Sequence, residues 1–416
     1  MTLSFVAALG LNILVKLWLM TRQNQHVAQN RAEVPKNFAN TITLEQHQKA
    51  ADYTLAKSKV GLVDLILESI VMLGWTLLGG LEWLNQALLS WMGAGLTQEL
   101  ALMVSFMLIG GLIALPLSWY QTFVVEERFG FNKTTPQLWL IDMVKGLALG
   151  AILGLPLLAL VLWLMEMGGQ VWWIWAWGAL VGFQLLMMWI APNWLMPLFN
   201  KFTPLEDSQL IERITALMNK SGFKAKGFFV MDGSKRSAHS NAFFTGIGSS
   251  KRVVFFDTLL SQLSGDEMEA VLAHELGHFK HKHIIKMMFT SFALTLIGLA
   301  LLGWLMTHSW FYTGLGVSPS VYASGAGQNN ALALLLFMMV VPLVTFLSAP
   351  ISSARSRKQE FEADAYAAHV SSASWLASAL IKLYQDNAST LTPDPWFVKF
   401  YYSHPPASER LERMLA

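Results

Sequence analysis

The chain has 416 residues, of which 54% are hydrophobic and only 13% charged, and its mean hydropathy is +0.43. Soluble domains carry about 25% charged residues, so this composition excludes an ordinary soluble protein and indicates a membrane protein. The 29 basic and 27 acidic residues nearly balance, which argues against nucleic acid as a partner. Because the sequence has no cysteine, any metal must be held by histidine and carboxylate side chains.

Seven segments are long and apolar enough to cross a bilayer, whose core of roughly 30 Å needs about 20 residues of helix. The first segment lacks the basic start of a signal peptide and contains Asn12 and Lys16, so we interpret it as a membrane span. The sequence therefore predicts a protein with seven transmembrane helices. They are Leu3–Met20, Val60–Leu81, Leu100–Tyr120, Ile141–Met165, Val171–Ala191, Ile285–Met306 and Ala331–Pro350.

The basic residues fall only on alternate loops between these spans, and the second, fourth and sixth loops have none. Lysine and arginine in short loops concentrate on the cytoplasmic side, so the long fifth loop and the C-terminal tail are predicted to face the cytoplasm. The predicted units are five helices in 1–199, a cytoplasmic unit in 200–284, two helices in 285–350 and a helical tail in 351–416. The Gly- and Ser-rich segment Gly314–Asn330 is predicted to be a mobile connection on the outside.

Several ionisable residues lie within or at the edge of the spans, where each costs a few kcal/mol unless it faces other helices or water. Asp64 and Glu68 are four residues apart and share one helix face. Hydrogen bonds between helices or a hydrated cavity account for this pair equally well at this point.

The fifth loop is long enough to fold into a small α+β unit. An amphipathic helix is predicted over Pro204–Gly222. Three short apolar runs follow and predict strands at Gly227–Met231, Ala242–Ile247 and Val253–Phe256. Ser264 and Glu267 then have the spacing of a capping box, which predicts the start of another helix.

That helix contains the sequence His274-Glu275-Leu-Gly-His278. Histidines four apart project from one helix face and can share one ion, with Glu275 beside the open coordination position. The pattern is typical of a catalytic zinc site. His281 lies about 10 Å from His274 along the helix axis, too far to share the ion, so we interpret His281 and His283 as residues of the membrane interface.

A catalytic zinc ion takes three protein ligands and leaves one position open. The tail offers Glu360 and Asp364 on one face of a predicted helix, with Glu362 turned away. Spacing alone does not choose between Glu360 and Asp364. Three histidines lie outside this helix face as further candidates: His239, His369 and His404.

The chain resembles the type I CaaX prenyl protease family of membrane zinc endopeptidases along nearly its whole length. The motifs that carry the resemblance occur in the family's order and with similar spacing. They are Thr21-Arg22-Gln23 with Val34-Pro35, the run Tyr120 to Glu127 with Gly130-Phe-Asn132, Pro197-Leu-Phe199 with Lys201-Phe-Thr-Pro204, Ser234-Lys-Arg236, His239-Ser-Asn241, Phe256-Asp-Thr-Leu-Leu260, the zinc helix, and Tyr402-Ser-His404-Pro-Pro406 with Glu409-Arg410-Leu411.

The resemblance implies that one zinc ion per chain is bound by His274, His278 and Glu360, and that Asp364 orients a ligand imidazole. It also implies that Asn241 lies near the substrate and that His404 stabilises the oxyanion. The implied fold is an all-α membrane protein whose seven helices enclose a chamber, with a small α+β zinc-peptidase unit on the cytoplasmic side. Gln359 and Phe243 depart from the family pattern, which puts only fine substrate preference in doubt.

The sequence therefore predicts a membrane zinc metalloendopeptidase that acts on peptides or proteins, including prenylated or membrane-embedded ones. The alternatives are a membrane-protein quality-control zinc protease and a non-catalytic transporter. The expected location is a multi-pass position in a bacterial cytoplasmic membrane, because the loops are short and the sequence carries no retention signal. Prenylated substrates would not be expected in a bacterium.

Overall fold

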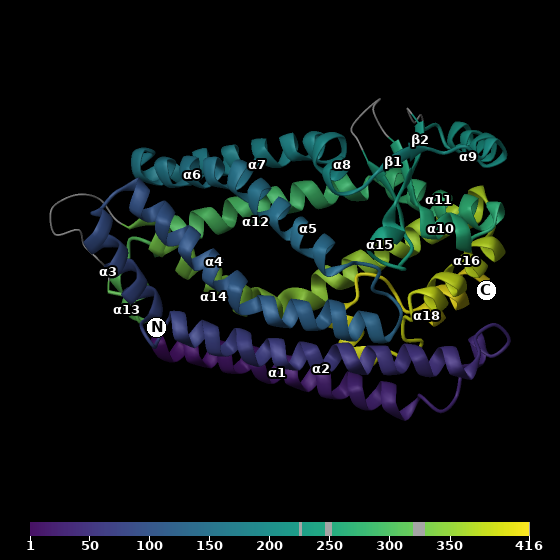
Figure 1. Cartoon of the computed structure of the whole chain (residues 1–416), viewed down its shortest axis with the longest axis horizontal. Helices are drawn as coiled ribbons and strands as arrows, with labels where there is room; N and C mark the ends of the chain where they lie inside the picture. Colours follow the sequence, from purple (N-terminus) through teal and green to yellow (C-terminus); the bar gives the residue numbers. More distant parts are fainter. Residues whose placement is uncertain (224–226, 246–251, 319–328, 416) are drawn as a thin grey trace.

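The computed structural model describes residues 1–223, 227–245, 252–318 and 329–415 (Figure 1). Within these ranges six helical segments are long and apolar enough to cross a membrane, and the bent pair α2–α3 makes a seventh. This number agrees with the seven predicted spans. The helices of this part are α1 (Thr2–Gln29), α2 (Leu44–Trp75), α3 (Gly80–Met92), α4 (Leu96–Tyr120), α5 (Pro136–Leu149), α6 (Leu155–Met167), α7 (Trp172–Ile190), α8 (Met196–Phe199), α12 (His283–Leu305), α13 (Ser309–Thr313) and α14 (Asn330–Thr345).

Three π-helical segments lengthen the spans. They lie at Gln121–Glu126, Gly150–Gly154 and Ala191–Leu195 and join their neighbours into helical segments of 31 or 32 residues. Pro156 follows the second segment and Pro192 lies within the third. A proline removes one backbone donor from the helix, so a local change of hydrogen-bond register beside it is expected.

The predicted second span, Val60–Leu81, lies within the bent pair α2–α3, but it is not one straight helix. Helix α2 already begins at Leu44, where Thr43 and Gln46 form a capping box, and it ends at Trp75. The chain then bends by 50° into α3. Gly79 adopts a left-handed conformation with φ 78°, which a continuing α-helix cannot contain, so the span cannot run straight through to Leu81.

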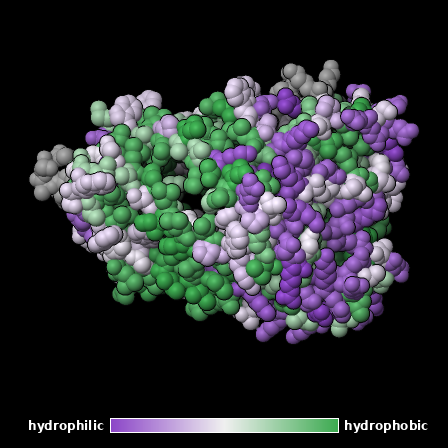
Figure 2. Space-filling view, viewed as in Figure 1, coloured by the Kyte–Doolittle hydropathy of each residue, from purple (hydrophilic) through white to green (hydrophobic). Residues whose placement is uncertain are grey.

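The membrane helices pack tightly at the end of the bundle that is remote from the sheet and its helices. Residues from eight different helices form one buried core there, including Phe5, Leu81, Leu102, Leu162 and Leu336. Other stretches of the membrane helices are mostly exposed. In the most apolar 18-residue stretch of Gly169–Phe199, only 6% of the residues are buried inside the protein. Figure 2 shows a mostly apolar surface over the half of the molecule that contains the membrane helices. The surface over the half that contains the sheet is mostly polar.

The polar half contains a four-stranded sheet with helices around it (Figure 1). The strand order is β1-β2-β4-β3, with β2 and β4 parallel and both outer pairs antiparallel. The strands are β1 (Phe202–Pro204), β2 (Gly227–Met231), β3 (Ala242–Thr245) and β4 (Arg252–Phe256), and the helices are α9 (Ser208–Lys220), α10 (Asp257–Gln262), α11 (Gly265–Lys280), α15 (Ala349–Val370), α16 (Ala373–Asp386), α17 (Pro395–Tyr401) and α18 (Ala407–Leu415).

The predicted strands of this unit are confirmed with small shifts, whereas the predicted helix Pro204–Gly222 is shorter: α9 begins at Ser208, and Pro204 belongs to β1. Strand β2 has the predicted bounds, and β4 starts one residue before them. The last two positions of the predicted strand Ala242–Ile247 lie outside the described residues, as does most of the predicted connection Gly314–Asn330. Strand β1 was not predicted because a three-residue run carries too little periodicity.

A cavity of about 1160 Å³ lies between helices α1 and α2 on one side and residues 239–275 and 360–410 on the other. Asp64 and Glu68 line it, as does Lys16, whose Nζ lies 4.0 Å from the Glu68 carboxylate. The cavity interpretation of this pair is therefore the one that the structure supports.

Candidate active site

Helix α11 begins with the predicted capping box, in which Ser264 accepts from the amide of Glu267 and the Glu267 carboxylate accepts from the amide of Ser264. Met268, Leu272 and Leu276 of this helix are at most 1% exposed and belong to one apolar cluster with Val253 and Phe255 of β4 and residues of α9 and α16. This burial fixes the rotation of the helix about its axis. His274 and His278 consequently face α15 rather than the sheet.

The Nε2 atoms of His274 and His278 and the carboxylate of Glu360 form the ligand triangle. The two Nε2 atoms are 3.3 Å apart. Nε2 of His274 lies 3.3 Å from Oε2 of Glu360, and Nε2 of His278 lies 3.3 Å from Oε1, the other oxygen of the same carboxylate. Ligand atoms that share a tetrahedral ion with bonds of about 2.0 Å are about 3.3 Å apart, so these separations fit three side chains around one zinc ion.

The buried carboxylate of Glu360 supports the same conclusion. Its Oε2 atom is fully buried and accepts no hydrogen bond from any described residue. An orphaned buried carboxylate oxygen is costly unless a cation or proton donor completes it. Two imidazoles and one carboxylate are also a donor set that zinc prefers. The residues present thus fit a bound zinc ion.

The close approach of α11 to α15 depends on Gly277. A Cβ added there would lie 2.8 Å from the Cα and 3.0 Å from the carbonyl oxygen of Ala363. Both residues are small and buried, so the two backbones come close enough for Glu360 to reach both histidines. Larger side chains at this crossing would move the carboxylate away from the imidazoles.

The other ring nitrogen of His274 contacts Asp364. Nδ1 of His274 lies 2.8 Å from Oδ1 of Asp364, and Arg410 of α18 donates to both oxygens of that carboxylate at 2.6 and 2.8 Å. Because Asp364 accepts the proton on Nδ1, the lone pair of His274 is on Nε2, toward Glu360. Asp364 thus contacts the imidazole of His274 and is not part of the ligand triangle, whereas Glu360 is. The geometry therefore distinguishes the two carboxylates between which the sequence spacing did not choose.

The sequence analysis missed two features around this triangle. The sequence identified Arg410 only as part of a motif, and the spacing of residues in α18 gives no sign that Arg410 contacts Asp364. His283 was interpreted as a residue of the membrane interface, and this is wrong: it is only 3% exposed, and its Nδ1 lies 2.9 Å from Nδ1 of His278. Both contacts join segments whose approach depends on tertiary packing.

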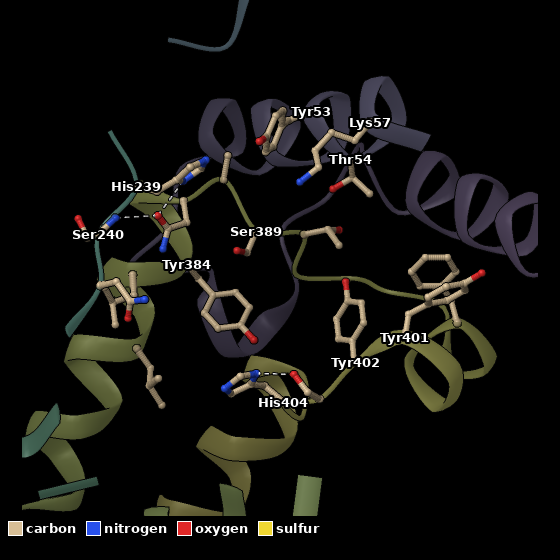
Figure 3. Close-up of a pocket in the computed structure, with 18 of the residues that line it drawn as sticks. Tyr53, Thr54, Lys57, His239, Ser240, Tyr384, Ser389, Tyr401, Tyr402 and His404 are labelled. Carbon is tan, nitrogen blue, oxygen red and sulfur yellow. Dashed lines mark hydrogen bonds between the residues drawn. The ribbon is translucent and has the colours of Figure 1, made fainter. Parts of the chain in front are cut away.

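Three further residues with predicted roles line the cavity beside the triangle: Glu275, His404 and Asn241. His404 is closest to the triangle, with Nε2 3.5 Å from Oε1 of Glu360. Asn241 precedes the edge strand β3, and its side-chain oxygen accepts from the amide of Ala242. Figure 3 shows His404 and Tyr384 of the tail pointing into the cavity.

Burial and nearby charges shift the pKa values of residues in and beside the ligand triangle. Burial opposes a charged His274, but the neighbouring carboxylates of Asp364 and Glu360 outweigh burial and raise the pKa of His274 to about 9. A metal ion would replace that proton. Burial raises the pKa of Glu275 and lowers the pKa of His404. Glu275 therefore holds a proton more strongly than an exposed glutamate does, which suits an acceptor in acid–base chemistry.

Two of the histidine candidates lie elsewhere. His239 stacks on Phe131 at 4.4 Å, and its Nδ1 lies 2.9 Å from the side-chain oxygen of Asn387. Neither His239 nor His369 belongs to a group of described residues that could hold a metal. His404 does not belong to one either, although it lies beside the triangle.

Comparisons with known proteins agree with this geometry. A family model for the CAAX prenyl protease N-terminal region, with five membrane helices, matches residues 23–201, and one for peptidase family M48 matches 204–416. CAAX prenyl protease 1 from Saccharomyces cerevisiae is 36% identical over 95% of this chain and 90% of its own length. The human CAAX prenyl protease 1 homologue is 30% identical over 99% and 95%.

A solved structure extends the likeness to the fold. The crystal structure of S. mikatae Ste24p is 35% identical and superposes with a TM-score of 0.91, covering 99% of this chain and 98% of that one. The likeness covers both the membrane helices and the peptidase unit, so the predicted chamber fold and the predicted resemblance are confirmed. The chain therefore belongs to peptidase family M48 as a homologue of CAAX prenyl protease 1, an integral-membrane zinc metalloendopeptidase.

Proposed function

We propose that His274, His278 and Glu360 hold one zinc ion per chain and that Asp364 orients His274. The observation that carries this proposal is the set of 3.3 Å separations that joins the two Nε2 atoms to each other and each of them to one oxygen of the Glu360 carboxylate. Oε2 of Glu360, which is buried and accepts no hydrogen bond from a described residue, also supports it. Arg410 neutralises Asp364, so the net charge of the ligand set rests on Glu360 alone.

Zinc, when bound, supplies a Lewis acid that polarises a peptide carbonyl and lowers the pKa of water. Glu275 is the proton acceptor in this proposal: its carboxylate takes a proton from the attacking water and passes it to the leaving amine. Burial of Glu275 in the cavity wall raises its pKa, which favours this two-way transfer. Its place directly after His274 on α11 puts it beside the ligand triangle.

His404 and Asn241 would donate hydrogen bonds to the oxyanion that develops during attack. If the Ser403 hydroxyl donates to Nδ1 of His404 over their 3.0 Å contact, the ring proton is on Nε2, near Glu360. Asn241 uses its oxygen on the Ala242 amide, so its NH₂ group is the end that serves as donor. Removing one such donor from an enzyme costs about 2.7–4 kcal/mol in barrier height.

An extended substrate is proposed to add to the sheet beside strand β3, which is the edge of the β1-β2-β4-β3 order. Ala242 at the start of β3 lines the cavity that contains the ligand triangle. Backbone hydrogen bonds to an edge strand bind peptides with little dependence on sequence. The scissile bond would then lie between this strand and α11.

The proposed substrates are prenylated peptides and other membrane-associated proteins. The likeness to CAAX prenyl proteases from yeast and human supports the prenylated class, and the volume of the cavity leaves room for more than an extended peptide. The proposed organisation has five helices in 1–199, the peptidase unit in 200–284, two helices in 285–350 and the tail in 351–416. The alternating basic loops support placing the catalytic unit and the C-terminus on the cytoplasmic side.

The zinc content of two variants tests the assignment of ligands. Glu360→Ala removes a ligand, and the purified protein should contain almost no zinc. Asp364→Ala removes only the partner of His274, and zinc should bind about 10–100-fold more weakly. Equal zinc content in the two variants would contradict the assignment.

Cleavage of a farnesylated CaaX peptide tests the substrate class against its unprenylated twin. Preference for the farnesylated peptide supports the proposal. Equal cleavage of both, with faster cleavage of unfolded membrane proteins, would instead favour the quality-control function.

A further inference from the structure

His283 is the first residue of α12, and it is buried against the active site. Residues five apart on an unbroken helix project about 140° apart, so His278 and His283 would not meet if α11 simply continued. The helix instead ends, and Lys282 adopts a left-handed conformation with φ 56° and ψ 35°. That conformation is costly for a residue with a Cβ and persists only where the surroundings hold it. The break brings His283 onto His278.

Two contacts define the role of the His283 ring. Its Nδ1 lies 2.9 Å from Nδ1 of His278, and its Nε2 lies 2.9 Å from Oε2 of Glu362. A carboxylate only accepts hydrogen bonds, so the proton of a neutral His283 ring is on Nε2 and its Nδ1 is an acceptor. His278 must then carry its proton on Nδ1. The lone pair of His278 is consequently on Nε2, the atom that faces Glu360 and His274.

We infer that His283 is a positioning residue, oriented by Glu362, that fixes the tautomer and ring orientation of His278 for zinc binding. This inference deepens the proposed function and rests on His278 being a zinc ligand. It also gives the two histidines of α11 different partners. His274 donates to a carboxylate that Arg410 neutralises, whereas His278 donates to an imidazole. Hydrogen bonds in such chains strengthen one another, so Glu362 acts on His278 through His283.

The same side chains permit one rival arrangement. Ligand atoms of His281, His283 and Glu362 also lie close enough together for a metal ion. In that arrangement Nε2 of His283 would bind the metal and could not carry the proton that Glu362 accepts. The two arrangements therefore exclude each other. The simultaneous contacts of both His283 nitrogens at 2.9 Å favour the hydrogen-bonded chain.

Zinc affinity of the full-length protein in detergent, measured by competition with a chelator, tests the inference. His283→Leu removes the acceptor and should weaken zinc binding about 10–100-fold. His283→Asn keeps an acceptor oxygen near the position of Nδ1 and should restore most of the affinity. Glu362→Gln keeps a carbonyl acceptor for His283 and should bind zinc more tightly than Glu362→Ala. His281→Ala is the matched control and should bind one zinc ion with unchanged affinity.

The cobalt-substituted protein gives a second readout that a purely structural role would not change. The visible absorption bands of cobalt should shift in His283→Leu and return toward the wild-type spectrum in His283→Asn. Unchanged zinc affinity in His283→Leu would overturn the inference, as would a second bound zinc ion that is lost in His281→Ala. His274→Ala separates these outcomes from failure of the proposed site: if it too retains zinc, the site itself is misassigned.

Discussion

A methyl group at Gly277 tests whether the distance between α11 and α15 sets the metal site. The added Cβ would lie 2.8 Å from the Cα of Ala363, whereas ordinary contact begins at 3.4 Å. The obstacle is backbone rather than the end of a flexible side chain, so one helix must recede by about 0.6 Å. Gly277→Ala therefore moves Glu360 relative to both histidines.

The expected effect follows from the size of that movement. Metal–ligand distances tolerate only about 0.2 Å, and a recession of about 0.6 Å exceeds this threefold. We expect Gly277→Ala to bind zinc about 10–100-fold more weakly, in the range seen when groups that orient ligands are removed. Overpacking should also lower the free energy of unfolding by about 1–3 kcal/mol.

Two measurements on the detergent-solubilised protein check these numbers. The zinc dissociation constant comes from chelator competition, and the thermal unfolding of the zinc-free protein reports stability. Gly298→Ala is the control, because its Cβ would lie 3.9 Å from the Phe337 ring in ordinary contact. It should leave zinc affinity unchanged. Wild-type zinc affinity and stability in Gly277→Ala would refute the argument from helix spacing.

Three other perturbations have defined outcomes. Arg410→Leu removes the only arginine paired with the buried charge of Asp364 among the described residues and leaves that charge with His274 alone, so it should lower the free energy of unfolding by about 3–5 kcal/mol, measured as a fall in thermal midpoint. Hydrogen bonds from Lys382 and its neighbours outweigh burial and lower the pKa of Glu267 to about 2. The stability that this contributes, up to about 3 kcal/mol, is present above pH 4.5 and is lost as pH falls toward 2. Thermal midpoints should therefore show that Lys382→Met destabilises the protein more at pH 6 than at pH 3. Lys282→Gly removes the left-handed penalty and should raise the thermal midpoint, while Lys282→Ile should lower it with weaker zinc binding.

Local sequence patterns were sufficient for much of this fold. The membrane helices follow from apolar length, and the start of α11 follows from its capping box, because each signal lies within one short segment. The i, i+4 spacing of His274 and His278 likewise fixes their common face without any knowledge of the tertiary structure. The bend after α2 was missed because the apolar run continues through it, although the pair Gly79-Gly80 is a sequence signal for a break in the helix.

The rest of the site depends on contacts between distant segments. Spacing within α15 could not choose between Glu360 and Asp364, because both lie on one face and differ by one helical turn. Their roles differ because of the way α15 crosses α11, where Gly277 lies close against Ala363. This crossing brings Glu360 to both histidines and leaves Asp364 beside His274 alone. His283 was misassigned for a similar reason. Its contact with His278 requires the left-handed turn at Lys282, which no propensity predicts for a lysine.

Zinc content measured together with peptide cleavage, on the wild type and on Glu275→Gln, tests the central claim most directly. The wild type should contain one zinc ion per chain and cleave the peptide. Glu275→Gln should retain that ion, because Glu275 is not among its proposed ligands, and should show no cleavage because the proton acceptor is gone. Cleavage by Glu275→Gln at the wild-type rate, or by wild-type protein free of metal, would contradict the mechanism.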